Sequence, residues 1–175
     1  RSFMRDDALD KSCGTAIYAD DLYMDGMLYA AVLRSAQPHA RILSIDAAEA
    51  EALEEVCAVI TADDVPHNRF GLLTPDQPVL AEGKVRCVGE AVAAVAAESD
   101  EAAQAALKKI RVEWEILEPL LDPREALKDD APYVQDLVPE GQVIKEYGKN
   151  IVSRRRINRG DVDAAFAECD VVIER

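Results

Sequence analysis

The stretch RSAQPHARILSID, residues 34–46, decides how the fold is interpreted. It holds one of the two histidines of the chain, and His39, Ser44 and Asp46 raise the question of a catalytic triad. The pattern of ARILSID is typical of a strand, and Pro38 sets the turn before it. On a strand, Ser44 and Asp46 share one face while His39 points to the other, so the three side chains cannot converge as a triad requires. We therefore predict a turn and a strand that carry no chemistry.

Apolar runs on both sides of this stretch predict several short strands. GMLYAAVLRS gives a strand over 28–33, and its nearly continuous apolar run predicts that both of its faces are covered. A short strand is also predicted at Ile17–Tyr18, after a turn at Gly14. VCAVITADDV gives one strand, IRVEWEIL gives an alternating strand around Trp114, and KVRCVGEAVAAVAAES gives two strands broken at Gly89–Glu90.

Good helix formers are concentrated in two main segments. AAEAEALEE follows Asp46, which can cap a helix, and Glu49 lies at capping-box spacing from it. The second helix begins at Ser99 or Asp100, with acidic residues in its first turn. Its apolar residues at i, i+3, i+4 and i+7 predict one buried stripe: Ala103, Ala106, Leu107 and Ile110. DPREALK predicts a shorter helix capped by Asp122.

The composition restricts the class of partner. The 175 residues are 49% hydrophobic and 31% charged, and the net charge is −14. Nucleic acid and anionic membrane surfaces attract basic proteins, so we exclude both as partners; the run Arg154–Arg156 is too short to reverse this. We find no signal peptide or transmembrane run, and the missing initiator methionine leads us to expect an excised or processed piece of a longer protein.

No catalytic, phosphate-binding or metal site is predicted from residue spacing. His67 is isolated, Asp20–Asp21 and Asp63–Asp64 suit capping or solvated roles, and no glycine-rich phosphate loop is present. The cysteines are widely spaced and lack the CxxC pairs that wrap zinc or an iron–sulfur cluster. We expect them to be reduced and mostly buried thiols of a cytoplasmic protein. They are Cys13, Cys57, Cys87 and Cys169.

Two regions depart from this regular pattern. The connection PHNRFGLLTPDQPVLAEG, residues 66–83, is loop-like but carries Phe70, Leu72 and Leu73, so it is expected to be functional or to pack on something else. After about Asp129 an extended linker is predicted. In the tail, DVDAAFAE predicts a helical turn or two, and CDVVIE predicts the start of a strand whose partner would lie outside the chain.

Four segments in order carry a resemblance to a known family. RDDALDKSCGTAIYADDLYMDGMLYAAVLRSAQPHARILSID, VCAVITADDVP, PVLAEGKVRCVGEAVAAVAAES and IRVEWEILEPLLDPREAL resemble the molybdenum-binding subunit of the xanthine dehydrogenase/aldehyde oxidase family. The match runs from Arg5 to about Leu127. At residues 11–14 the family usually reads Lys-Val-Thr-Gly where this chain has Lys-Ser-Cys-Gly, so Cys13 departs from the pattern. The tail NRGDVDAAFAECDVVIE resembles the family's connection into its next domain.

This resemblance implies an α+β fold, the α/β-hammerhead, with a mixed sheet and two main helices over residues 1–129. Residues 130–175 are then a linker and the start of the following molybdopterin-binding domain. Family members hydroxylate purines, other N-heterocycles or aldehydes with water as the oxygen source, using molybdopterin, [2Fe–2S] clusters and usually FAD. The implied partners are the downstream molybdopterin-binding domains and the iron–sulfur/FAD domains or subunits, and the family also allows a homo-oligomer. The implied location is cytoplasmic.

The resemblance also assigns the apolar loop. It implies that Gly71, Leu72 and Leu73 lie near the mouth of a substrate channel completed by another domain. The alternative is that Leu72 and Leu73 fill the core of this domain. The family's catalytic glutamate and its cofactor-binding residues are implied to lie downstream, so Gly89–Glu90 belongs to the hammerhead strands and no catalytic, cofactor-binding or metal residue is expected in this chain.

Two functions from different classes follow. The first is the substrate-channel domain of a molybdenum hydroxylase, which is inactive as an isolated fragment. The second is a free-standing, non-catalytic binding or interaction module that reuses the hammerhead fold. The strand predicted at the end of the tail, with no partner in the chain, favours the first.

Overall fold

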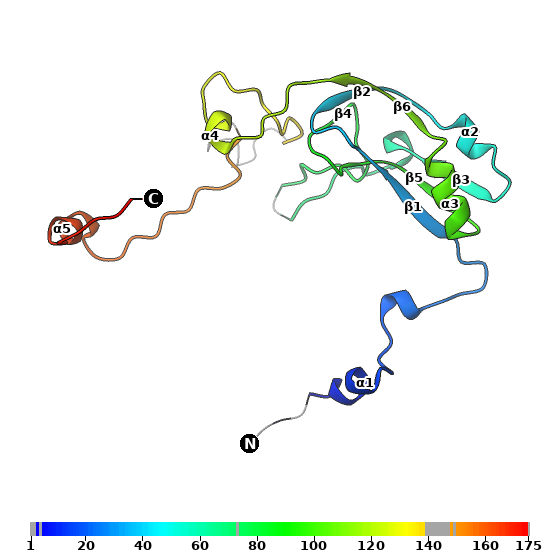
Figure 1. Cartoon of the computed structure of the whole chain (residues 1–175), viewed down its shortest axis with the longest axis horizontal. Coiled ribbons are helices and arrows are strands. Elements are labelled where there is room, and N and C mark those ends of the chain that lie inside the picture. The colour runs from blue at the N-terminus through cyan, green and yellow to red at the C-terminus, as the bar shows by residue number, and fades with distance from the viewer. Residues whose placement is uncertain (1–2, 4, 73, 139–147, 149, 175) are drawn as a thin grey trace. The chain divides into compact units, whose positions relative to one another are not determined.

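The computed structural model describes residues 3, 5–72, 74–138, 148 and 150–174 (Figure 1). It divides into two compact units, Arg1–Asn68 with Pro78–Glu118, and Arg69–Gln77 with Pro119–Arg175. The elements of the first unit are α1 (Ala8–Cys13), η1 (Ala19–Asp21), β1 (Tyr29–Arg34), β2 (Ala40–Asp46), α2 (Ala48–Glu51), β3 (Val56–Ile60), η2 (Ala62–Asp64), β4 (Lys84–Val85), β5 (Ala91–Ala97), α3 (Asp100–Leu107) and β6 (Arg111–Ile116). Those of the second are α4 (Pro123–Ala126) and α5 (Val162–Ala167).

The strands of the first unit form two antiparallel sheets. One has the order β1-β5-β3 and the other β4-β2-β6. Every pairing in them is antiparallel, as in β1 with β5, where Tyr29 lies opposite Ala97. The prediction of an α+β fold with short strands is therefore confirmed, but that of a mixed sheet is wrong. Apolar patterning identifies a strand without specifying the direction of the strand beside it.

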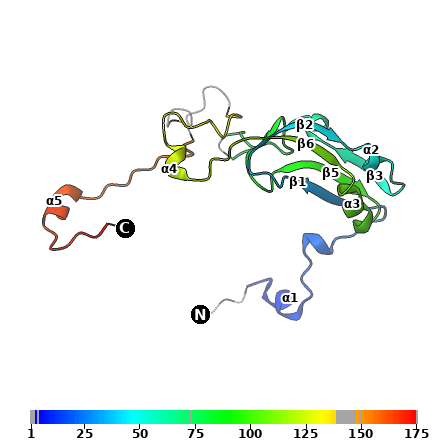
Figure 2. The same cartoon turned by 45° about the horizontal axis from the view of Figure 1, so that its top comes forward.

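Helix α3 covers one face of the β1-β5-β3 sheet. Ser99 caps the helix by accepting the Ala102 N–H at 3.2 Å, as predicted. Figure 2 shows α3 beside β1 and β5, which it contacts. The predicted stripe is confirmed, since its alanines and Ile110 are buried and Leu107 packs against them. Their partners in the core are Ala31, Ala93, Val95 and Ala97.

A second cluster joins the two sheets. It consists of Ala40 from β2, Val85 from β4, Val92 from β5, and Ala81. Partly buried side chains of β2 and β6, including Ile42 and Trp114, pack against it. Both clusters are built from Ala, Val and Ile, because the chain has few aromatic residues with which to fill a larger interior.

Several expectations are corrected by the first unit. Ile17–Tyr18 forms no strand; α1 ends at Gly14, whose φ of 73° is the left-handed conformation of a helix C-cap. Strand β1 is covered on one face only, with its burial alternating along the strand. All four cysteines are free but exposed, not buried. An apolar sequence context predicts burial only if another element covers that face.

Helix α2 forms in the predicted segment, but its N-cap is Ala47 instead of Asp46, and the capping box is absent. Asp46 accepts the Ala48 N–H at 3.1 Å. Glu49 does not reach back to the cap; its carboxylate pairs with Arg111 and, at 3.6 Å, with Lys109. The helix spans only Ala48–Glu51, so this end of the element is held by ion pairs with the chain around β6.

The second unit contains the predicted helices, and one asparagine ties its chain together. Asp122 caps α4 through the Arg124 N–H at 2.7 Å, and Asp161 caps α5 through the Ala164 N–H at 3.0 Å. Asn150 has a positive φ of 59°, and its amide bonds the backbone of Ala126, Pro132 and Val134 at 2.9–3.2 Å.

Two predictions in the second unit have other outcomes. Residues 170–174 do not form the predicted strand. The tail therefore gives no evidence for a partner strand outside the chain. Residues 139–147, within the predicted linker, lie outside the described part.

Among the described residues, no helix is both long and apolar enough to cross a membrane.

Candidate functional site

The structure separates the three residues that first raised the question of a triad. His39 Nδ1 lies 2.8 Å from the Glu118 carbonyl oxygen, which can only accept, so Nδ1 carries the proton and donates it. Ser44 Oγ donates to Glu113 at 3.3 Å, and Asp46 accepts the Ala48 N–H at 3.1 Å. No two of the three bond each other in these contacts. The predicted turn and strand are confirmed, and the side chains hold the scaffold.

Arg41 has a comparable scaffold role. Its guanidinium pairs with Glu115 at 3.0 Å across the β2–β6 ladder. His39 fixes the start of β2 to the chain that leaves β6, where the Leu117 N–H also donates to the His39 carbonyl at 3.0 Å. Both residues therefore fix the turn and the register beside it.

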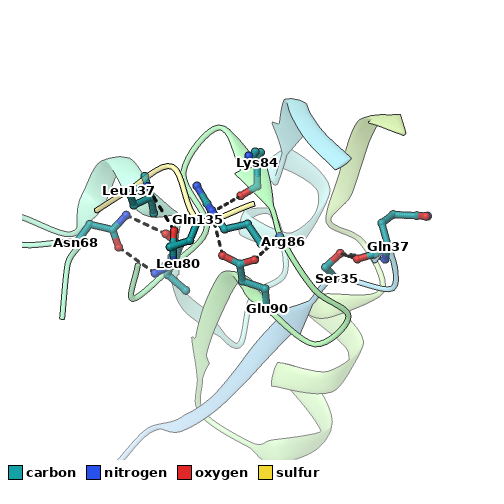
Figure 3. Close-up of polar contacts among 9 residues, drawn as sticks. All are labelled: Ser35, Gln37, Asn68, Leu80, Lys84, Arg86, Glu90, Gln135 and Leu137. Carbon is teal, nitrogen blue, oxygen red and sulfur yellow. Dashed lines mark hydrogen bonds and ion pairs between the residues drawn. The ribbon is translucent and has the colours of Figure 1, made fainter. Parts of the chain in front are cut away.

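Glu90 lies in the turn between β4 and β5 and is held by its own loop. Its carboxylate accepts the Arg86 backbone N–H at 2.5 Å and the Arg86 guanidinium at 3.2 Å (Figure 3). The two side chains are only 8% and 13% exposed. Ser35 and Gly89 tie the turn to the end of β1 through backbone bonds of 2.8–2.9 Å. With both carboxylate oxygens engaged by Arg86, the predicted scaffold role of Gly89–Glu90 is supported by the geometry.

The segment that carries the predicted site, Arg69–Gln77, is closed by a bridge between Phe70 and Gln77. Phe70 and Gln77 exchange two backbone hydrogen bonds of 2.8 and 3.0 Å. A Cβ atom at Gly71 would lie 1.8 Å from the Thr74 carbonyl oxygen, so the chain approaches itself too closely there for any side chain. Leu72 is fully exposed. Leu73 lies outside the described residues.

The exposure of Leu72 argues against one of the two roles considered for it. A leucine that fills the core loses most of its contact with water, whereas this side chain is 100% exposed. Leu72 therefore does not fill the core of this domain. The backbone bridge closes this segment, and its exposed leucine is suited to contacting a surface outside this chain.

Asn68, immediately before this turn, is a structural residue that sequence reasoning missed. Its amide donates to the Leu80 carbonyl at 2.8 Å and accepts the Leu80 N–H at 2.9 Å (Figure 3). The side chain thus bonds both backbone groups of Leu80, as a neighbouring strand would, and closes the connection that contains Gly71 and Leu72. The residues are twelve apart, so no local motif marks the pair.

The second unit has an apolar pocket that the sequence also did not predict. Its volume is about 240 Å³. Leu120, Tyr133, Val138 and Ile151 contribute apolar side chains, and Asp76 of the Arg69–Gln77 segment lines it as well. A pocket of this size and character suits an apolar group. Its walls come from segments of weak local pattern, which is why periodicity could not reveal it.

Donors for a metal are not gathered in the described part of the chain. No three His, Cys, Asp or Glu side chains among those residues are placed to hold an ion.

The fold defines an α+β hammerhead domain. Residues 13–118 match the family model described as "Aldehyde oxidase and xanthine dehydrogenase, a/b hammerhead domain". The chain belongs to the xanthine dehydrogenase/aldehyde oxidase family, as the hammerhead domain of its molybdenum subunit. The resemblance found in the sequence is thereby confirmed.

Relatives agree in sequence and structure. The chain is 47% identical over 99% of its length to a probable xanthine dehydrogenase subunit of Bacillus subtilis (strain 168), and 41% identical over 96% to the "Nicotinate dehydrogenase large molybdopterin subunit" of Eubacterium barkeri. It superposes on the Cu,Mo-CO dehydrogenase with a TM-score of 0.77 at 34% identity over 97% of its length. It superposes on quinoline 2-oxidoreductase from Pseudomonas putida 86 with a TM-score of 0.76 at 34% identity over 98% of its length.

The chain matches only part of each relative. It spans 22% of the Bacillus subtilis protein, 37% of the Eubacterium barkeri subunit and 22% of each of the two solved chains.

Proposed function

We propose that this chain is the N-terminal structural and substrate-channel domain of a molybdenum hydroxylase. The complete enzyme would hydroxylate a purine, another N-heterocycle or an aldehyde, with water as the source of oxygen. The observation that carries the proposal is the fully exposed Leu72 in the Arg69–Gln77 segment of a chain of this family. The proposed site is Gly71, Leu72 and Leu73: Gly71 permits the close turn, and the leucines contact the entering substrate.

The chemistry of the proposed enzyme would come from other parts of it. Residues 130–175 would be a linker and the start of the molybdopterin-binding domain. The cofactor, when bound there, would supply the oxygen-transfer chemistry, and [2Fe–2S] clusters and FAD would carry the electrons away. The described residues of this chain would exclude water and orient the substrate with apolar side chains. In support, relatives at 47% and 41% identity bear the names of such enzymes.

The proposal also names the partners of the chain and the cell compartment in which the enzyme works. The partners would be the downstream molybdopterin-binding domains and the iron–sulfur/FAD domains or subunits, and assembly into a homo-oligomer is compatible with it. The cytoplasm would be the compartment, which the four free cysteines support.

A free-standing binding module is the competing function. Sequencing the source gene past Arg175 and purifying its complete product separates the two. The proposal expects further cofactor-binding domains in the gene, and molybdenum in the purified protein. A stop codon directly after Arg175 would overturn it and support the free-standing module.

A further inference from the structure

The outer face of the β1-β5-β3 sheet carries two rows of apolar side chains. Directly paired residues share a face of a sheet, so the register defines two rows across the three strands. One row is Ala30, Ala96 and Ala58, and the other is Val32, Ala94 and Ile60. We call these six residues the open face. The alternate residues of β5, such as Val95, point to the opposite face and are buried in the core with α3.

The open face is uncovered in the described structure. Ala30, Ala58, Val32 and Ile60 are exposed, the last two by 37% and 41%. The alanines of the central strand are half-buried by their neighbours. A contiguous apolar face of this kind is rare on an isolated domain and marks a surface that another element covers.

The other sheet shows what a face adapted to water looks like in this chain. Across β2 and β6, Arg41 lies opposite Glu115, Ser44 opposite Glu113, and Asp46 opposite Arg111. The first two of these pairs are joined by side-chain contacts of 3.0 and 3.3 Å. Polar rows of this type are usual where an antiparallel sheet meets solvent. With 31% of the chain charged, six apolar positions in two rows stand out as a face that is not adapted to water.

We propose that the open face is the docking surface for the remaining polypeptide of the complete enzyme, which covers it with an apolar surface of its own. The proposal rests on the function proposed above. The occupant is argued from length: the chain matches 22% of the Bacillus subtilis relative and 22% of the CO dehydrogenase chain, so most of each polypeptide lies outside the matched part. Small side chains allow a helix or another sheet to approach the strands closely.

The test measures thiol labelling in the purified, molybdenum-loaded complete enzyme. Ala30→Cys and Ala94→Cys place a thiol on the open face, and Ser44→Cys places one on the polar face of the other sheet as the matched control. Each variant is treated with a maleimide, and peptide mapping by mass spectrometry separates the new cysteine from the native ones. Molybdenum content and turnover, measured alongside, report whether each variant is intact.

We expect the two open-face thiols to react at least about tenfold more slowly than the Ser44→Cys thiol, because a covered thiol reacts only when the interface opens. Equal rates at all three positions would overturn the proposal. Protection that disappears when the enzyme is diluted below its oligomer dissociation range would also overturn it, because the occupant would then be a second copy. A purified protein without molybdenum would instead refute the proposed function, so the two failures are distinguishable.

Discussion

Arg86 and Glu90 form a nearly buried ion pair that closes the turn between β4 and β5, at 3.2 Å between guanidinium and carboxylate. Ser35 holds the same turn at its backbone. The consequence is that the Gly89–Glu90 pair, which could be taken for a catalytic glutamate, serves the scaffold.

Glu90→Gln is therefore expected to destabilise the domain. Removing one charge of a buried pair leaves the other poorly compensated and costs about 3 kcal/mol. Glu115→Gln is the matched control, because its pair with Arg41 is half-exposed and contributes at most about 1 kcal/mol. Urea unfolding of both variants measures the free energies. Equal losses in the two variants would show that the Arg86–Glu90 pair is not special.

The His39–Glu118 bond gives a second prediction. His39→Ala removes a buried hydrogen bond, but it also removes the Nε2 atom, which is buried and has no hydrogen-bond partner among the described residues. The two effects oppose each other, so we expect a net loss of about 1–2 kcal/mol in the free energy of unfolding. The exposed His67 is the control: His67→Ala should be nearly neutral. A neutral His39→Ala variant would remove the anchoring role of this bond.

Gly71→Ala tests the shape of the Arg69–Gln77 turn. The new methyl group would collide with the Thr74 carbonyl, so the turn must open and the Phe70–Gln77 bridge should break. Hydrogen exchange of the Phe70 and Gln77 amides should become faster. Gly26→Ala meets no atom within 4 Å, and its positive φ costs only about 1 kcal/mol, so exchange at the bridge should not change. Unchanged protection in Gly71→Ala would contradict the described turn.

The sequence predicts the helices and strands better than the contacts between them. The alternation around Trp114 and the stripe of α3 depend on periodicity within one element, and both are confirmed. Three other features depend on which elements meet: the strand directions in the sheets, the exposure of Cys57 and the exposure of the open face. Periodicity within one segment carries no information about such contacts.

The candidate site shows the same division. Family resemblance directs attention to Gly71 and Leu72, and the structure adds the close approach at Thr74 and the exposure of Leu72. The Asn68–Leu80 contact could not be predicted because it joins residues twelve apart through a side-chain amide, a pairing that has no sequence signature.

The most direct test of the proposed function is the kinetics of the complete enzyme with Leu72→Ala and Leu73→Ala. If these leucines line the substrate channel, truncating an apolar contact of about 1–3 kcal/mol should change KM by roughly tenfold or more. Molybdenum and iron contents should stay at the wild-type level, because a leucine side chain has no atom that can bind a metal. Unchanged KM and kcat in both variants would contradict the substrate-channel assignment.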